Sequence, residues 1–274
     1  MSEVFTGEAY DLASDGQAVV RHPAGYVVFV AGLWLGETAQ IRILQYRKKH
    51  AIGEIVRVES ASTDRRKPPC RFHGTGGQDC GACPWMFIDY EAQLQAKYDR
   101  VKRSIEKLPH SREALRPIAR SEKEFSYRNR AQFKTNGKRL GFVSARDKQL
   151  VTIDDCLILS EKNRETLSEL IAALPEKRWK PRNRQAFTTL DIDESCDAAQ
   201  VSINKRLPFL QANAGQNNRM REWLAQKVHA LETKETIVEL FCGSGNFTEV
   251  IVENNKAAIL AIDVADEEIG RAHV

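Results

Sequence analysis

The sequence predicts a multidomain chain: a five-stranded OB-like β-barrel over residues 1–60, a central α+β domain over 61–206, and the start of a Rossmann-like α/β domain over 207–274. Three patterns lead to this prediction. They are short alternating strands near the N-terminus, a glycine-rich stretch with three cysteines, and a strand, glycine turn and helix near the C-terminus. A length of 274 residues also exceeds one typical domain.

The composition limits which cellular compartment and which binding partners we expect. A net charge of +4 with a pI near 8.7 is a mild basic excess, which alone does not indicate nucleic-acid binding. The N-terminus lacks a signal-peptide pattern, and no run of about eighteen apolar residues occurs. We therefore expect a monomeric cytoplasmic protein without a membrane segment, whose six cysteines favour metal or catalytic roles over disulfides.

Residues 8–59 alternate in short apolar runs separated by turn residues such as Asp15-Gly16. Five strands in about fifty residues match the size of a small closed barrel. The last hairpin carries five basic side chains, namely Arg42, Arg47, Lys48, Lys49 and His50. They suit an RNA backbone, and they also suit an exposed edge that only water covers.

A cysteine-rich segment follows the barrel. Residues 61–69 are polar and end in two prolines, which predicts a linker leaving the barrel. Cys70, Cys80 and Cys83 then lie among glycines that let the backbone fold around one centre, and C-x2-C spacing directs two thiolates at it. This pattern predicts a metal or cluster site that lacks one ligand.

The best candidate for the fourth ligand is Cys156, just before a helix that we expect to begin near Ser160. Four thiolates fit tetrahedral zinc or a [4Fe–4S] cluster, so the spacing leaves both open. His73 is a possible substitute ligand, although such a histidine is more often a plain loop residue. Cys196 has the surroundings of a loop residue, and small size is a sufficient reason for Cys242.

The central segment predicts a helix over residues 89–108 and a hairpin that turns at Asn136-Gly137. The helix has one apolar face, formed by Leu94, Tyr98, Val101, Ile105 and Leu108. The hairpin interleaves basic and aromatic residues, namely Arg128, Arg130, Lys134, Lys138 and Arg139 with Tyr127, Phe133 and Phe142. This mixture suits RNA, and it equally suits a hairpin with aromatic residues in the core and basic ones in water. Residues 177–184 add a second basic stretch.

A βαβ half-unit is expected near the C-terminus. It comprises a helix over 214–231, a strand over 237–241 that contains Glu239, a tight turn at Gly243-Ser244-Gly245, a helix beginning at 247–252 and a strand over 257–263. Asp263 ends the second strand, where an acid can bind the ribose hydroxyls of an adenosine. Thr248 replaces the third glycine of a dinucleotide motif, which favours S-adenosylmethionine over NAD.

With these motifs together, the chain resembles the bacterial RNA 5-methyluridine (uracil-C5) methyltransferases, particularly the ribosomal-RNA branch. The resemblance rests on a TRAM-like pattern from Ser14 to Gly32, the C-x9-C-x2-C run with a distant cysteine, L-P-F-L-Q-A-N-A-G-Q-N over 207–217, and E-L-F-C-G-S-G-N-F-T over 239–248. It implies an RNA-binding TRAM barrel and methylation of uracil C5, with 23S ribosomal RNA as the expected substrate. A tRNA methyltransferase or a non-catalytic iron–sulfur RNA-binding module are the alternatives.

The resemblance also implies the ligands. The four cysteines, Cys70, Cys80, Cys83 and Cys156, would hold a [4Fe–4S] cluster, for which we expect a structural role rather than electron transfer. The S-adenosylmethionine site would include Gln211, Phe241, Asn246 and Asp263 around the glycine turn at Gly243 and Gly245.

In this family a cysteine attacks C6 of a flipped-out uracil and a base removes the C5 proton. Both residues belong to the C-terminal half of the methyltransferase domain, so we expect them beyond Val274 and assign no catalytic residue here. Cys242 belongs to the glycine turn and is not taken as the nucleophile. Residues Glu268 to Val274 resemble a translated sequencing adapter, and we expect a non-native end and an inactive fragment.

Overall fold

A computed structural model describes residues 3–182, 184–207, 209–232 and 235–264, and the chain divides into two compact units. The first unit comprises Met1–Arg120 and Arg139–Ile153, and the second comprises Ser121–Lys138 and Asp154–Val274. The three-domain division made from the sequence stays a prediction. The suspected non-native residues, Glu268 to Val274, lie outside the described residues.

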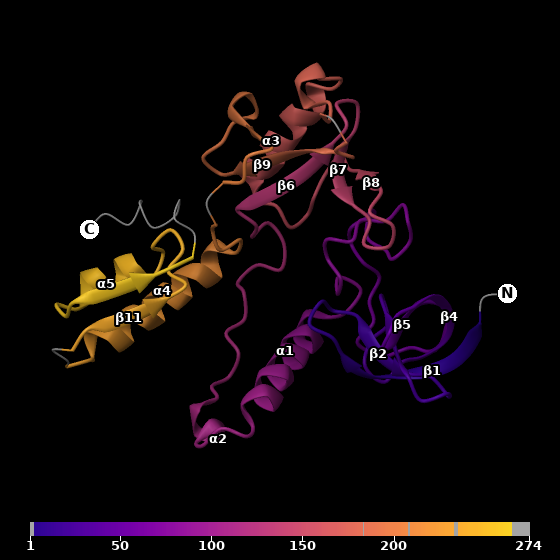
Figure 1. Ribbon diagram of the computed structural model, residues 1–274, viewed down its shortest axis with the longest axis horizontal. Helices are drawn as coiled ribbons and strands as arrows, with labels where there is room; N and C mark the ends of the chain where they lie inside the picture. Colours follow the sequence, from indigo (N-terminus) through magenta and orange to yellow (C-terminus); the bar gives the residue numbers. More distant parts are fainter. Residues whose placement is uncertain (1–2, 183, 208, 233–234, 265–274) are drawn as a thin grey trace. The chain divides into compact units, whose positions relative to one another are not determined.

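The first unit contains seven strands and two helices among its described residues: β1 (Val4–Leu12), β2 (Ala18–Arg21), β3 (Val27–Val30), β4 (Thr38–Tyr46), β5 (His50–Ser60), α1 (Tyr90–Ile105), α2 (Ser111–Ala114), β7 (Leu140–Val143) and β8 (Leu150–Thr152). The first five strands form a closed barrel in the order β1-β2-β3-β5-β4 (Figure 1). β3 and β5 pair in parallel, and the other neighbours are antiparallel. The predicted five-stranded barrel is confirmed, although β1 begins at Val4 rather than near Glu8.

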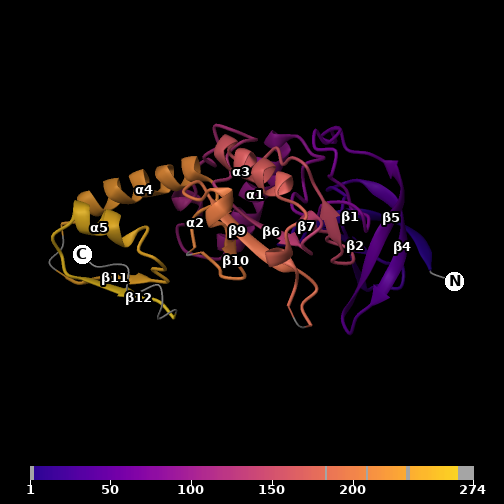
Figure 2. The same cartoon turned by 90° about the horizontal axis from the view of Figure 1, so that it is seen from above.

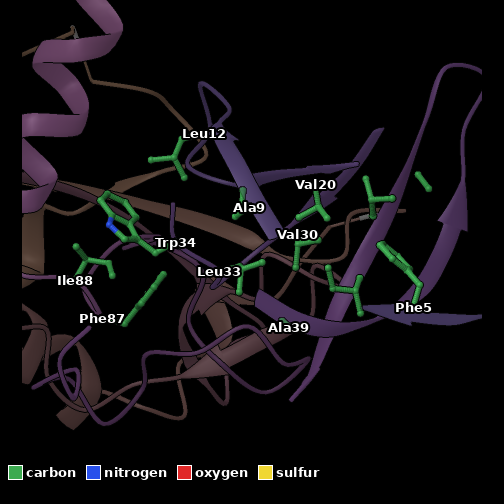
Figure 3. Close-up of a cluster of buried hydrophobic side chains, with 14 of the residues drawn as sticks. Phe5, Ala9, Leu12, Val20, Val30, Leu33, Trp34, Ala39, Phe87 and Ile88 are labelled. Carbon is green, nitrogen blue, oxygen red and sulfur yellow. The ribbon is translucent and has the colours of Figure 1, made fainter. Parts of the chain in front are cut away.

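The barrel core continues into the segment that follows the cysteines. Phe87 and Ile88 are buried beside Leu33 and Trp34 of the barrel (Figure 3). The ring of Trp85 meets that of Trp34 edge-on at 5.1 Å, and its indole N–H donates to the Gly16 carbonyl at 2.8 Å. These contacts fix the end of the cysteine segment against the barrel.

Residues 61–69, predicted as a linker leaving the barrel, are tied to the barrel by a buried ion pair. The Glu37 carboxylate is fully buried and accepts two hydrogen bonds from the Arg65 guanidinium, at 2.7 and 2.6 Å. It also accepts the backbone N–H groups of Trp34 and Ser62. Burial alone raises the pKa of Glu37, but these hydrogen bonds and the charge of Arg65 lower that pKa below its ordinary value.

Helix α1 confirms the predicted helix, with ends at Tyr90 and Ile105, but only part of the expected apolar face is buried. Leu94 packs inside, whereas half of Val101 and 60% of Leu108 remain exposed. Arg103, on the same helix, reaches Asp11 of the barrel at 2.9 Å. The apolar period predicted the helix correctly and overestimated the length of its buried face.

The second unit contains β6 (Arg130–Thr135), α3 (Glu161–Ala172), a 3-10 turn η1 (Lys177–Trp179), β9 (Thr188–Asp193), η2 (Ala198–Gln200), β10 (Ser202–Ile203), α4 (Ala214–His229), β11 (Ile237–Leu240), α5 (Thr248–Asn254) and β12 (Ile259–Ile262). β9 pairs antiparallel with both β6 and β10. α3 begins one residue after its N-cap Ser160, as expected. No helix of the described residues is long and apolar enough to cross a membrane.

Strand β6 places two of the basic residues before Asn136-Gly137 in contact with the neighbouring strand β9. The Arg130 guanidinium is buried and forms two hydrogen bonds with Asp191, at 3.1 and 2.6 Å. Phe133 is fully buried, and the Lys134 ammonium donates to the Thr189 hydroxyl. These three residues therefore contribute to packing and hydrogen bonding within the sheet, and RNA contact by the rest of the hairpin stays a prediction.

Strands β11 and β12 pair in parallel, with Leu240 opposite Ile262. α4 and α5 cover one face of this pair (Figure 2). The predicted strand, turn, helix and strand are all present, so the βαβ half-unit is confirmed.

Candidate functional site

The carboxyl end of β11 leads into a tight loop formed by residues 241–247, which we call the glycine loop. Gly243 and Gly245 both have positive φ, of 55° and 88°. The N–H of Gly245 donates to the Cys242 carbonyl, and the N–H of Cys242 donates to the Ile262 carbonyl. The loop therefore turns within three residues and returns the chain to α5, which glycine permits without steric cost.

Asp263 lies directly after β12, at the same edge of the sheet as the glycine loop. Its carboxylate accepts the N–H of Gly243 at 2.8 Å. Ligands of parallel α/β sheets bind at the carboxyl ends of the strands, and an acid after the second strand is suited to ribose hydroxyls. The geometry thus brings together two residues that were singled out from the sequence.

Phe241 has features that packing does not explain. Its φ of 62° lies in the left-handed region, and 83% of its surface is exposed. This backbone conformation costs a non-glycine residue about 1–2 kcal/mol. The strain lies in the Phe241 backbone, and its exposed ring at the edge of the loop is available to stack on a planar ligand.

The segment that contains Gln211 is held close to the loop. The Ser244 hydroxyl donates to the Phe209 carbonyl at 3.5 Å, and the Asn129 amide donates to the Gln211 carbonyl at 3.1 Å. The Asn213 side chain caps α4 by accepting the N–H of Gln216. Residues 209–213 of this motif therefore lead into α4, and Phe209 contacts the glycine loop.

Asn246 occupies the end of the loop, but its side chain is engaged with the protein. It exchanges two hydrogen bonds with Asn217 of α4, at 3.1 and 2.9 Å. Arg221 of α4 donates to both the carbonyl and the side-chain oxygen of Asn246. Asn217 and Arg221 were not predicted as site residues from the sequence. They follow the helix cap Asn213 by four and eight residues, which places all three on one helix face.

The cysteine segment folds back on itself within the first unit. The N–H of Cys80 donates to the Phe72 carbonyl at 2.7 Å, and that of His73 donates to the Cys70 carbonyl. Burial raises the pKa of the Cys80 thiol, and the nearby Cys70 adds to this effect, while the N–H of Ala82 lowers it. The turn from Cys70 to His73 and the β-bridge between His73 and Cys80 bring the two cysteines close together, and the N–H of Ala82 is directed at the Cys80 sulfur.

Cys156 lies in the second unit, before α3. Its N–H donates to the Asp155 carboxylate at 2.7 Å, and Arg164 of α3 holds the same carboxylate with two hydrogen bonds, at 2.8 and 2.7 Å. Among the described residues, no three histidine, cysteine, aspartate or glutamate side chains gather closely enough to hold a metal ion. The four-cysteine site stays a prediction.

Comparisons with known proteins agree on one kind of enzyme. A family model described as tRNA (Uracil-5-)-methyltransferase matches residues 189–274. An uncharacterized RNA methyltransferase of Nitrosomonas europaea is 38% identical over 271 residues, which cover 97% of this chain and 69% of that protein. One of Bdellovibrio bacteriovorus is 29% identical over 242 residues, which cover 86% of this chain and 59% of that protein.

A solved structure shows the same fold. The Pyrococcus abyssi tRNA (uracil-54, C5)-methyltransferase in complex with S-adenosyl-L-homocysteine matches with a TM-score of 0.60 and 17% identity, over 94% of this chain and 79% of that chain. The Nitrosomonas relative spans almost all of the present chain, and the family model covers its βαβ half-unit. The chain therefore belongs to the RNA uracil-5-methyltransferase family.

Proposed function

We propose that this chain binds S-adenosylmethionine at the glycine loop and serves the methylation of uracil C5 in RNA. The observation that carries the proposal is the meeting of Asp263, Gly243 and the exposed ring of Phe241 at the carboxyl end of two parallel strands. The Asp263 carboxylate suits the ribose hydroxyls, and the backbone of the glycine loop suits the amino-acid part of this methyl donor. The Phe241 ring suits its adenine.

Several features support the methyl donor over a dinucleotide. Thr248 takes the place of the third glycine, and its hydroxyl donates to Glu239 of β11 at 2.5 Å. This contact joins α5 to the strand through side chains, whereas a glycine at this position allows the close helix approach of a dinucleotide site. The Pyrococcus neighbour was solved with S-adenosyl-L-homocysteine, the product of methyl transfer.

The RNA partner of the proposal is 23S ribosomal RNA, bound in part by the N-terminal barrel, which we interpret as a TRAM domain. Arg47, Lys48 and Lys49 are exposed at the tip of the β4–β5 hairpin, next to the exposed ring of Tyr46. Charged tips with a neighbouring aromatic ring suit a single-stranded backbone and its bases. A tRNA substrate is the second candidate, because both the family model and the Pyrococcus neighbour are described as acting on tRNA.

We further propose that Cys70, Cys80, Cys83 and Cys156 hold a [4Fe–4S] cluster. The neighbouring thiols of Cys70 and Cys80 and the amide of Ala82 directed at Cys80 support this proposal. Thiolate ligands with N–H···S hydrogen bonds are the usual surroundings of such a cluster. When bound, the cluster would join segments far apart in the sequence and contribute to stability.

The methyl-donor site is tested by titrating the chain with S-adenosylhomocysteine in a calorimeter, with NAD in a parallel titration. We expect saturable binding of the first and none of the second. Gly243→Ala should weaken binding, because it adds a Cβ at a positive φ inside the site. Gly25→Ala is the matched control, since Gly25 also has positive φ and has no atom within 4 Å of its added Cβ. Tight binding of NAD, or equal effects of both variants, would contradict the assignment.

The RNA substrate is tested by fluorescence anisotropy with two labelled transcripts of equal length, a 23S ribosomal RNA hairpin and a tRNA. Tighter binding of the ribosomal hairpin supports the first candidate, and tighter binding of the tRNA supports the second. Equal affinity for both and for an unrelated RNA would remove the specificity part of the proposal.

The cluster is tested by anaerobic purification with quantification of iron, sulfide and zinc. We expect about four iron and four sulfide per chain, with broad visible absorption. Cys83→Ser should lower the iron content, and Cys196→Ser, which changes a half-buried cysteine outside the proposed set, should not. A colourless, zinc-loaded chain would refute the iron–sulfur assignment.

A further inference from the structure

Three polar residues of α4 lie on one face of the helix, one turn apart: Asn213, Asn217 and Arg221. Asn213 caps the helix through the N–H of Gln216, at 3.0 Å. The other two reach away from their own helix. Asn217 and Arg221 both contact the glycine loop, and helix capping does not require these contacts.

The contacts hold one loop residue from two sides. Asn217 donates to and accepts from the amide of Asn246, at 3.1 and 2.9 Å. The Arg221 guanidinium donates to the backbone carbonyl of Asn246 and, at 3.4 Å, to its side-chain oxygen. Its other nitrogen reaches Glu249 of α5 at 2.8 Å. Both the side chain and the main chain of Asn246 are therefore fixed by α4.

We propose that Asn217 and Arg221 are positioning residues, which hold the glycine loop in its ligand-binding conformation from α4. This inference rests on the proposed methyl-donor site. The loop contains two glycines, whose backbones can adopt many conformations, and Phe241, whose positive φ is strained, so an unanchored loop has many alternatives to this conformation. Anchoring its end lowers the conformational entropy that a ligand must remove on binding.

The charge of Arg221 fits this role. Its fork joins a loop carbonyl to the Glu249 carboxylate, so that a single side chain links the glycine loop, the first turn of α5 and α4. Hydrogen bonds that involve a charged group contribute more than neutral ones. A lysine keeps the charge but loses the fork, and therefore should hold only one of the two partners at a time.

The chain offers close controls for both residues. Asn255 also uses its amide to hold the segment after α5 against α4, donating to the carbonyls of Val228 and Leu231 at 2.9 and 3.0 Å. These contacts lie at the opposite end of α4, away from the glycine loop. Arg219 lies on α4 as well, but its guanidinium contacts Glu122. Asn255→Ala and Arg219→Gln thus match the chemistry of the tested changes at residues whose hydrogen bonds hold other segments.

The experiment measures two quantities for the wild type and for Asn217→Ala, Arg221→Gln, Arg221→Lys and the two controls. They are the Kd for S-adenosylhomocysteine and the hydrogen-exchange rate of loop amides 241–247 in the free chain. We expect Asn217→Ala and Arg221→Gln to raise the Kd about tenfold, the scale of one lost hydrogen bond to a fixed partner, and to speed loop exchange. Arg221→Lys should fall between wild type and Arg221→Gln, and the controls should match wild type.

Each outcome is decisive. Wild-type Kd and loop exchange in Asn217→Ala and Arg221→Gln would overturn the inference. Equal weakening by Asn255→Ala would also overturn it, because a general loss of stability would then explain the effect. If the wild type does not bind the ligand, the proposed function fails, while the exchange rates still decide whether α4 anchors the loop.

Discussion

The barrel and the βαβ half-unit use alternating strands in different ways. In the barrel, inward residues such as Val20, Val28 and Ile41 are fully buried, and in β4 they alternate with the polar residues Thr38, Gln40 and Arg42. In β11 and β12 the half-buried residues alternate with exposed apolar residues on the opposite face. Leu240, on the exposed face, has 61% of its surface accessible. Parallel strands usually have both faces covered, whereas the described residues cover one face here. Packing thus explains the barrel, whereas in the half-unit it explains only the face of β11 and β12 that the helices cover.

The two units bury charge in the same way, and the glycine loop differs from both. Each compact framework contains a buried carboxylate paired with arginine, Glu37 with Arg65 and Asp191 with Arg130. The glycine loop has no such buried pair among its described residues, and its strain is concentrated at Phe241. Stability and ligand binding should therefore respond to different substitutions.

The largest expected effect is on the buried ion pairs. Arg130→Met should lower the free energy of unfolding of the second unit by about 3–5 kcal/mol, because Asp191 stays buried without its counter-ion. Urea denaturation followed by the fluorescence of buried Trp179 measures this loss. Arg130→Met combined with Asp191→Leu should recover much of it. A loss below about 1 kcal/mol in the single variant would show that the pair is dispensable.

The same pairs predict how stability depends on pH. The pKa of Glu37 and that of Asp191 both lie below their ordinary values of 4.5 and 3.8, despite burial, because of their hydrogen bonds and the nearby arginines. Their contribution is therefore complete above about pH 5 and is lost as the pH falls through the lowered folded-state values. Urea midpoints from pH 7 to pH 3 should fall more steeply in wild type than in Glu37→Gln. Parallel curves would contradict the assignment for the barrel.

Phe241 should separate ligand binding from stability most clearly. Phe241→Gly removes an exposed ring and its left-handed strain, so the stability of the second unit should change by no more than about 1 kcal/mol. Affinity for S-adenosylhomocysteine should fall by about 1–3 kcal/mol, the range for a stacked base. Calorimetry and urea denaturation on the same sample check both values. A stability loss with unchanged affinity would reverse the interpretation.

The smallest effect on folding is expected at the hairpin tip. Lys48→Glu with Lys49→Glu should change barrel stability by less than about 0.5 kcal/mol, since both side chains are exposed. This double substitution should weaken RNA binding. It should also reduce the slope of log K against log salt concentration by about 0.7 for each lost phosphate contact. Lys123→Glu with Lys162→Glu carries the same charge change on exposed residues of the second unit. Equal effects of both pairs would indicate that only net charge matters.

Much of the fold was predictable because strands and helices leave periodic signals. The barrel and the βαβ half-unit follow directly from apolar alternation and glycine turns. The role of residues 61–69 was not predictable, because Arg65 and Glu37 are 28 residues apart and only the closed barrel brings them together. The burial of Arg130 has the same cause, since Asp191 lies on a strand 61 residues later.

The candidate site shows the same limit. Gly243, Gly245 and Asp263 were found from their places at strand ends, where local rules apply. Asn217 and Arg221 remained unnoticed because polar residues on a helix face usually meet water, and only the loop contact reveals their role. The sequence signal that could have identified them is their position four and eight residues after the helix cap Asn213.

The most direct test of the account is hydrogen exchange of the whole chain with and without S-adenosylhomocysteine. We predict added protection at residues 209–217, 239–247 and 259–263, which the structure groups around the glycine loop, and no change in β1 to β5. Protection confined to the barrel, or no protection in any of these segments at saturating ligand, would contradict the central claim that this loop is the methyl-donor site.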